Sequence, residues 1–75
     1  MARKRPRDIE KDYPKAAFVA KLRRLANAIE NDTRFVISVA GTRIHVPSGA
    51  KFNLEHERTA SEEELEFQIK WKPAK

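Results

Sequence analysis

The stretch from Glu63 to Lys72 carries apolar residues at every second position from Leu65 onward, with polar residues between them. Its apolar members are Leu65, Phe67, Ile69 and Trp71. Because a β-strand sends alternate side chains to opposite faces, the stretch predicts a strand with one apolar face and one charged face. Four large apolar side chains on one face need a cover. The rest of the chain must therefore supply an apolar surface to lie against them.

The chain has 75 residues and no cysteine, which limits the ways in which it can be stabilised. A domain of this size buries only about 60% of the surface that its unfolded chain exposes. A sequence without cysteine has no disulfide, no thiolate zinc site and no thiol catalysis. Below about 80 residues, such a chain needs a well-patterned core, a partner subunit or both. We therefore expect a single domain, with a homodimer as one possible state.

Positive charge is concentrated near the N-terminus. Residues 1–24 carry nine Lys or Arg and three Asp or Glu, whereas residues 25–75 carry seven and eight. Residues 1–11 hold one large apolar residue after the initiator, Ile9, and too little can be buried there to offset the entropy of ordering. We expect a disordered basic tail over residues 1–11 and the folded domain over residues 12–75. The asymmetry indicates contact with nucleic acid or an acidic protein, or only a solvated tail.

A helix is predicted from Asp12 to Glu30, because apolar residues recur there at spacings of four, three and four. They form one stripe, which consists of Phe18, Leu22, Leu25 and Ile29. Asp12 is suited to the N-cap, and Pro14 is tolerated in the first turn, where backbone N–H groups lack intrahelical partners. Asn31 and Asp32 end the helix, and Asn31 is suited to the left-handed C-terminal position.

Two strands joined by a tight turn follow the helix. The first runs from Phe35 to Val39, and Ile44 and Val46 continue its apolar face on the second. Gly41-Thr42 is predicted as a type II′ turn, because glycine suits the first central position of that turn. This turn pairs Val39 with Ile44 and Ile37 with Val46. The turn Pro47–Ala50 then ends the second strand.

The third strand and the last one form a second hairpin, whose register has two interpretations. Phe52 and Leu54 form the inward face of the third strand, and His56 and Arg58 continue that face toward the rim. A tight turn at Ala60-Ser61 places Glu55 opposite Glu66 and Glu57 opposite Glu64, which is unfavourable for like charges. We favour a longer loop, which places Glu55 opposite Gln68. The alternative is that the carboxylates bind a cation or a basic partner, including the protein's own tail.

These elements predict an α+β fold with one N-terminal helix packed on a four-stranded antiparallel β-meander, in the order αββββ. The helix stripe is expected to cover the apolar face of the sheet. A lone helix is narrow for four strands, so part of the set Phe35, Val36 and Trp71 is expected at an interface. The expected core is Phe18, Leu22, Leu25, Ile29, Phe35, Ile37, Val39, Ile44, Val46, Phe52, Leu54, Leu65, Phe67, Ile69 and Trp71.

Three segments together carry a family pattern. They are a helix with Leu22, Leu25 and Ile29, the run FVISVAGTRIHVP from Phe35, and the ending LEFQIKW from Leu65. From Lys15 to Trp71 the chain resembles the amphi-Trp domain family, small prokaryotic proteins named for an amphipathic C-terminal strand that ends in tryptophan. The resemblance implies a prokaryotic source and a small cytoplasmic domain. The family has no established activity, so the resemblance transfers no functional residues.

The sequence contains no motif for catalysis, for a cofactor or for a metal. His45 and His56 are predicted on opposite faces, so they cannot share one metal or one proton relay. Two glycines are too few for a phosphate cradle, and no Ser-His-Asp order is present. No apolar run approaches the ~20 residues of a membrane span, and no apolar segment follows the basic N-terminus as in a signal peptide. We therefore expect a cytoplasmic non-enzyme with no cofactor and no small-molecule substrate.

Two functions remain as hypotheses. The first is a binding module for an anionic partner, most simply the backbone of a nucleic acid, with nonspecific and salt-dependent binding. The second is a protein-interaction or self-assembly module that uses the open edges of its sheet. In the first, the phosphate contacts are Arg3, Lys4, Arg5, Arg7, Lys11, Lys15, Lys21, Arg23 and Arg24.

Overall fold

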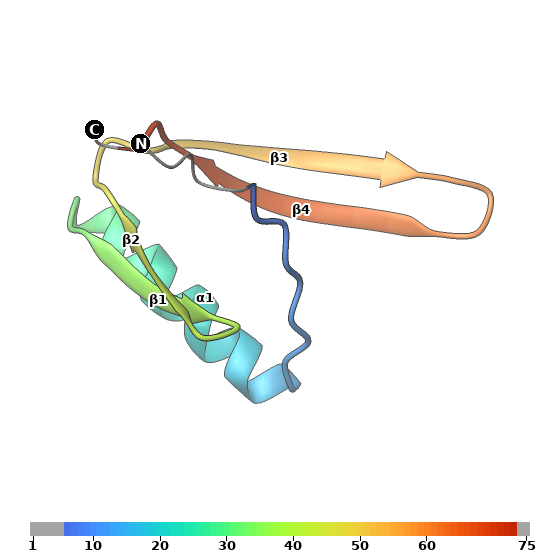
Figure 1. The fold of residues 1–75 in the computed structure, drawn as a ribbon, viewed down its shortest axis with the longest axis horizontal. Helices are drawn as coiled ribbons and strands as arrows, with labels where there is room; N and C mark the ends of the chain where they lie inside the picture. The colour runs from blue at the N-terminus through green and yellow to red at the C-terminus, as the bar shows by residue number, and fades with distance from the viewer. Residues whose placement is uncertain (1–5, 74–75) are drawn as a thin grey trace.

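The computed structural model describes residues 6–73, which contain one helix and four strands. The elements are α1 (Lys15–Glu30), β1 (Phe35–Val39), β2 (Thr42–Val46), β3 (Lys51–Arg58) and β4 (Glu63–Lys70). The strands of each pair run antiparallel. This arrangement confirms the predicted α+β class and the order of a helix followed by four strands (Figure 1).

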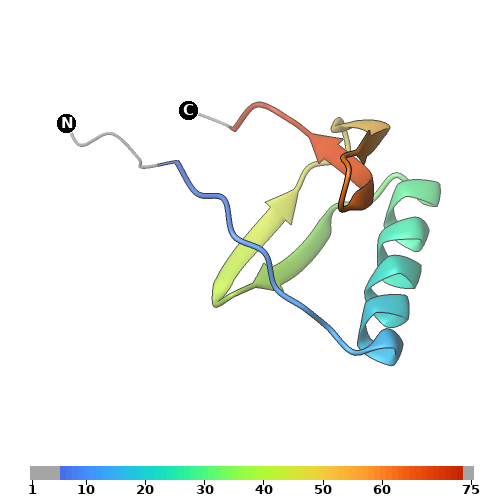
Figure 2. The same cartoon turned by 90° about the vertical axis from the view of Figure 1, so that its right-hand side faces the viewer.

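The four strands form two separate hairpins. β1 pairs with β2, and β3 pairs with β4, each as a two-stranded sheet. Between the hairpins the chain turns at Pro47, whose carbonyl accepts a hydrogen bond from the Ala50 N–H at 3.3 Å. Pro47 has no N–H with which to continue the β2 ladder, so pairing ends at Val46. The first hairpin lies against α1, whereas the second, residues 51–70, projects away from it (Figures 1 and 2). We call the second hairpin the arm.

Helix α1 begins after Pro14 rather than at Asp12. Pro14 is the N-cap residue, with φ −60° and ψ 156°, and no side chain caps the helix. The residue before a proline is disfavoured in the helical region, because the proline ring clashes with its backbone. Tyr13 therefore does not take a helical position, and the predicted start at Asp12 is wrong.

The helix ends in a Schellman motif, in which two backbone N–H groups bond back to the last turn. The Asp32 N–H donates to the Ile29 carbonyl at 3.2 Å, and the Thr33 N–H donates to the Ala28 carbonyl at 2.9 Å. Asp32 takes the left-handed conformation, with φ 59°, whereas Asn31 has φ −95°. The predicted left-handed position is therefore wrong by one residue.

The first hairpin turns at Ala40-Gly41, where φ is 48° and 83°. Positive φ at both central positions is the mark of a type I′ turn, in which glycine serves the second position. Val39 consequently pairs with Thr42, and Ile37 pairs with Ile44. The predicted type II′ turn at Gly41-Thr42 is wrong, and its pairing is shifted by two residues. Because the shift is even, the apolar residues keep their face.

The arm has the tight register, which brings its carboxylates opposite each other. Glu55 pairs with Glu66, and Glu57 pairs with Glu64. Thr59 closes the turn: its N–H donates to the Glu62 carbonyl at 2.8 Å, and its hydroxyl oxygen accepts from the Glu62 N–H at 3.1 Å. The longer loop that the sequence favoured is therefore wrong. The hydrogen bonds of the turn outweigh the repulsion between the paired glutamates, because charges at an exposed surface are screened.

The buried core is small and lies between α1, the first hairpin and the base of the arm. Its members are Ala28, Phe35, Val46 and Ala50. Half-buried against this core are Leu25, Ile37, Ile44, Ile69 and Trp71. Among the described residues no side chain is fully buried. The predicted core is therefore realised at the first hairpin, and it is wrong for Phe18, Leu22, Ile29, Phe52, Leu54, Leu65 and Phe67, which are exposed.

The molecule is extended for its length. Its radius of gyration is 14.3 Å, whereas a compact domain of this size has a value of about 11 Å. Its accessible surface is 7352 Å², whereas a compact monomer of this mass exposes about 4,700 Å². Figure 1 shows where the excess arises, because the arm stands away from the helix and the first hairpin.

Candidate interaction site

The arm presents one apolar face to solvent. Its residues are Phe52 and Leu54 on β3 and Leu65 and Phe67 on β4, which are 52%, 62%, 65% and 67% exposed. Strand pairing sets Leu54 directly opposite Phe67, and Phe52 opposite the half-buried Ile69. Side chains on one face of paired strands are in contact range, so these residues form one contiguous apolar face. This is the largest departure from the predicted core.

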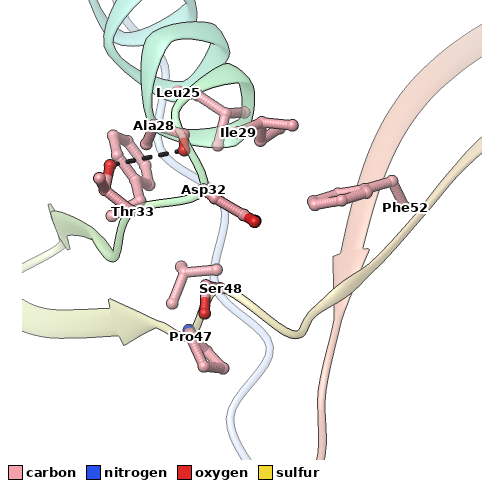
Figure 3. A pocket seen from close by; sticks show the side chains of 10 residues that line it. Leu25, Ala28, Ile29, Asp32, Thr33, Pro47, Ser48 and Phe52 are labelled. Carbon is pink, nitrogen blue, oxygen red and sulfur yellow. Dashed lines mark hydrogen bonds between the residues drawn. The ribbon is translucent and has the colours of Figure 1, made fainter.

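At its base, the apolar face of the arm meets the end of the helix. A recess there is lined by Leu25, Ala28, Ile29, Asp32, Thr33, Phe35, Val46, Pro47, Ser48 and Phe52. The Phe52 ring points from the arm toward the C-terminal end of α1 across this recess (Figure 3). The apolar face is therefore continuous with the core at its base and loses its cover toward the tip.

The helix carries a second exposed apolar surface. Leu25 and Ala28 pack toward the core, but Phe18 is 55% exposed and Leu22 and Ile29 are more than a third exposed. We call Phe18, Leu22 and Ile29 the open stripe of the helix. The sequence predicts that the helix stripe covers four strands. Within one chain, only part of this stripe packs against the rest of the protein.

The opposite face of the arm is acidic. Gln68 donates from its amide nitrogen to Oε1 of Glu55 at 2.7 Å and to Oε2 of Glu66 at 3.0 Å. The pKa of Glu64 is raised from its ordinary value of 4.5, mainly by the negative charge of Glu66. Glu10 of the N-terminal segment contributes to the same rise, so this segment passes near the acidic face. The two faces of the arm therefore differ completely in chemistry.

The tip of the arm holds an ion-paired cluster. Nη2 of Arg58 donates to Oε2 of Glu63 at 2.9 Å, and Nε2 of His56 lies 2.7 Å from the same oxygen. These contacts, first the one with Arg58, hold the pKa of Glu63 below its ordinary value of 4.5. His56 has the hydrogen-bonded rim position that the sequence predicts, and His45 is exposed on the other hairpin. Residues 6–73 contain no group of three or more His, Cys, Asp or Glu that could hold a metal ion.

The predicted anion contacts are spread over several parts of the molecule. Arg7 donates to the Val39 carbonyl at 2.7 Å, and Arg24 donates to the Val36 carbonyl at 2.6 Å. Arg24 also lies over the Phe35 ring, 5.1 Å from its centroid. Two of the predicted contacts are therefore engaged with β1.

Two other predicted contacts meet at an aromatic ring. Lys11 and Lys21 lie over Tyr13, with their ammonium nitrogens 5.5 Å and 4.8 Å from the ring centroid. Tyr13 was not among the residues predicted from the sequence, although an aromatic residue just before a basic helix is a signal for such a cluster.

Five predicted contacts remain, and the structure describes two of them. Lys15 and Arg23 are exposed on α1, whereas Arg3, Lys4 and Arg5 lie outside the residues that the structure describes. Residues 6–14 have no regular secondary structure, so the basic tail of residues 1–11 stays a prediction.

In the described part of the chain, the helix is too short and too polar to span a bilayer. Comparisons with protein-family models, curated proteins and solved structures find no match to this chain. The resemblance to the amphi-Trp domain family therefore stays a prediction. The candidate site rests on its geometry.

Proposed function

We propose that the chain is a small protein-interaction module whose recognition element is the apolar face of the arm. The observation that carries this proposal is the exposure of four large apolar side chains on one contiguous face, Phe52, Leu54, Leu65 and Phe67. Soluble monomers rarely expose apolar patches above a few hundred Å², and larger patches mark sites of interaction. A two-stranded hairpin is also marginal in water unless its apolar face packs on something. A protein partner on this face supplies that packing.

The strand edges of the arm favour the same function. Each strand of a two-stranded sheet has one edge whose outward N–H and C=O groups lack a strand partner. Such an edge accepts an added strand, so main-chain hydrogen bonds along β3 or β4 can reinforce the apolar contact. The edge of β1 is less open, because its Val36 carbonyl already accepts from Arg24.

The proposal assigns no catalytic residue, cofactor or small-molecule substrate. A cytoplasmic location and a prokaryotic source stay predictions that rest on the sequence and its resemblance. The acidic face of the arm has a role in this function, because repulsion between like-charged faces discourages indiscriminate stacking of arms.

Affinity capture from a cell extract tests the proposal. The bait is the full chain, compared with the double variant Leu54→Ser, Phe67→Ser, which removes an opposed apolar pair. The matched control is Asn53→Ser, Gln68→Ser, an opposed pair on the other face of the same strands. The expected result is a protein that the wild type and the control retain and the apolar-face variant loses. Retention of the same proteins by all three baits would contradict the proposal.

We propose binding of a nucleic-acid backbone as a second candidate function. Its support is the cluster at Tyr13, where the ammonium groups of Lys11 and Lys21 lie over one aromatic ring. Two ammonium groups held over one ring form a local concentration of positive charge that attracts phosphates. The concentration of positive charge in residues 1–24 adds a salt-dependent, sequence-independent attraction.

Fluorescence anisotropy with labelled single-stranded DNA and RNA at low and physiological salt tests this second function. The full chain is compared with a chain that starts at Asp12 and with the variant Lys21→Gln. Binding is expected to weaken steeply with salt and to weaken in both altered chains. Equal binding by all three chains, or no binding even at low salt, would remove this function.

A further inference from the structure

We infer that the partner of the arm is a second copy of this chain, and that the arm of each copy lies on the open stripe of the other copy's helix. This inference rests on the proposed function, because it names the partner of the same apolar face. The result is a two-fold dimer with exchanged arms, in which each copy contributes the same two surfaces.

One copy of the chain does not complete its own core. Four residues are buried, and no described side chain is fully buried. A chain of 75 residues without disulfides needs a dense core or a partner subunit. A partner required for the fold itself must be present whenever the chain is made. A second copy meets that requirement without any other gene product.

The exposed apolar area is large enough for an interface between two copies. The four exposed side chains of the arm each leave on the order of 100 Å² open, so the apolar face offers on the order of 400 Å² per copy. The open stripe of the helix adds a second apolar surface on the same chain. With polar surroundings, two reciprocal contacts reach the ~1,200–2,000 Å² that specific interfaces bury. Each copy exposes 7352 Å², so it can bury its share of this interface and keep most of its surface in water.

The arm is held away from the helix of its own chain. The turn that joins the hairpins is tight, since the Ala50 N–H bonds to the Pro47 carbonyl. Ala50 is only 7% exposed and belongs to the core, so the base of the arm is fixed on the first hairpin. The proline ring further restricts the backbone at this turn. Closure of the arm onto its own helix would have to break these contacts, whereas a second copy can reach the apolar face as it stands.

The arm and the rest of the described chain carry net charges of opposite sign. Residues 51–70 carry three Lys or Arg and six Glu, whereas the described residues 6–50 carry eight Lys or Arg and five Asp or Glu. An arm with a net charge of −3 therefore approaches a described helical half with a net charge of +3. In a two-fold dimer, both arm-to-helix contacts bring opposite net charges together, which favours association. Two arms packed on each other alone would instead bring like charges together.

Sedimentation equilibrium of the full chain across a wide concentration range is the first test. The inference predicts a mass of two chains that falls to one on dilution. Leu54→Ser, Phe67→Ser on the arm and Phe18→Ser on the helix are each expected to weaken the dimer at least tenfold, because each change occurs twice. Asn53→Ser, Gln68→Ser is the matched control and is expected to leave the dimer unchanged. The mass of a single chain at every concentration would overturn the inference.

Cross-linking then tests which surfaces meet. The chain contains no cysteine, so Phe18→Cys and Phe67→Cys can be made separately, mixed and treated with a short bis-maleimide. Exchanged arms predict a product that joins one variant to the other. Products that join only Phe67→Cys to itself would show arms packed on arms and overturn the exchange.

The two tests separate this inference from the proposed function. If the wild type is a monomer but the apolar-face variant still loses a captured partner, the second-copy inference fails and the proposed function stands. If the wild type is a monomer and that variant loses nothing, both fail.

Discussion

The two hairpins of this protein follow the same sequence pattern and have opposite environments. Both alternate between apolar and polar residues, and both are antiparallel pairs with tight turns. In the first hairpin, Phe35 and Val46 are buried beneath α1, whereas in the arm Leu65 and Phe67 are about two-thirds exposed. Alternation therefore predicts that a strand has an apolar face. It does not identify the element that covers this face.

The size of the helix explains why one hairpin is covered and the other is not. Four strands spaced about 4.8 Å apart need a cover roughly 19 Å across, whereas one helix is only about 10 Å wide. The single helix of residues 6–73 therefore suffices for one hairpin. The second hairpin must find its cover elsewhere, and in the dimer that we propose a second copy supplies it.

The largest expected difference between the two hairpins is the loss in free energy of unfolding when a phenylalanine is replaced by alanine. Phe35→Ala is expected to lower the free energy of unfolding by about 3 kcal/mol, because it leaves a cavity in the small core. Phe67→Ala is expected to cost less than about 1 kcal/mol in the monomer, because its ring makes few contacts there. Urea denaturation of dilute samples, followed by Trp71 fluorescence, measures both. Equal losses at the two positions would contradict the contrast between covered and open hairpins.

The turns of the two hairpins give the next largest contrast. Gly41→Ala is expected to destabilise the protein by about 1–2 kcal/mol, because φ is 83° at this position and a Cβ makes that conformation unfavourable. Ser61→Ala in the arm turn is expected to change stability by less than about 0.5 kcal/mol, because the bonds that close this turn come from Thr59. Thermal unfolding compares the two variants. A neutral effect of Gly41→Ala would exclude the type I′ turn.

A smaller effect, this time a gain in stability, is expected at the C-terminal end of α1, beside the first hairpin. Asp32→Gly is expected to stabilise the protein by about 0.5 kcal/mol, since glycine removes the strain of φ 59° but loses more entropy on folding. Asn31→Gly is the matched control, and it is expected to destabilise slightly because Asn31 has negative φ. If Asn31→Gly stabilises and Asp32→Gly does not, the Schellman motif is placed at the wrong residue.

The smallest expected effect is the pH response of the arm. The pKa of Glu64 is raised, so the repulsion on the acidic face is present at neutral pH and is relieved as pH falls through that raised pKa. The pKa of Glu63 is lowered, so its stabilising contacts at the tip are present above 4.5 and are lost as pH falls through the lowered value. NMR titration of the side-chain carboxyl carbons measures both.

The two carboxylates should therefore titrate on opposite sides of 4.5. Glu66→Gln is expected to return the pKa of Glu64 toward its ordinary value, because Glu66 is the main source of the shift. The same variant is expected to leave Glu63 unchanged, since its partners are Arg58 and His56. Titration of both carboxylates at one pH would contradict the register of the arm.

The elements themselves could be predicted from the sequence, because local chemistry determines them. Alternation predicted all four strands, and Pro47 correctly marked the end of β2. The helix was correct, but its start was not, since the restriction that Pro14 places on Tyr13 outweighed the capping tendency of Asp12. Ala28 was missed in the core because the prediction considered only large side chains, and because it lies three residues after Leu25, beside the predicted stripe and not on it.

The assembly could not be predicted in the same way. The registers depend on turn bonds, such as those of Thr59, that compete with side-chain pairing at nearly equal energy. The separation of the hairpins depends on a single turn at Pro47–Ala50. The exposed face of Leu65 and Phe67 follows from that turn and not from the composition of the strands. Of the predicted anion contacts within residues 6–73, only Lys11 and Lys21 meet, at a ring that the charge count did not include.

Small-angle X-ray scattering over a dilution series tests most directly the claim that the arm stands open. An open arm predicts the mass of two chains at high concentration and, on dilution, a monomer whose radius of gyration is close to 14.3 Å. A monomer with a radius of gyration near 11 Å, the value of a compact domain of this length, would contradict that claim. Such a result would show the arm closed on its own helix, with no apolar face left for a second copy.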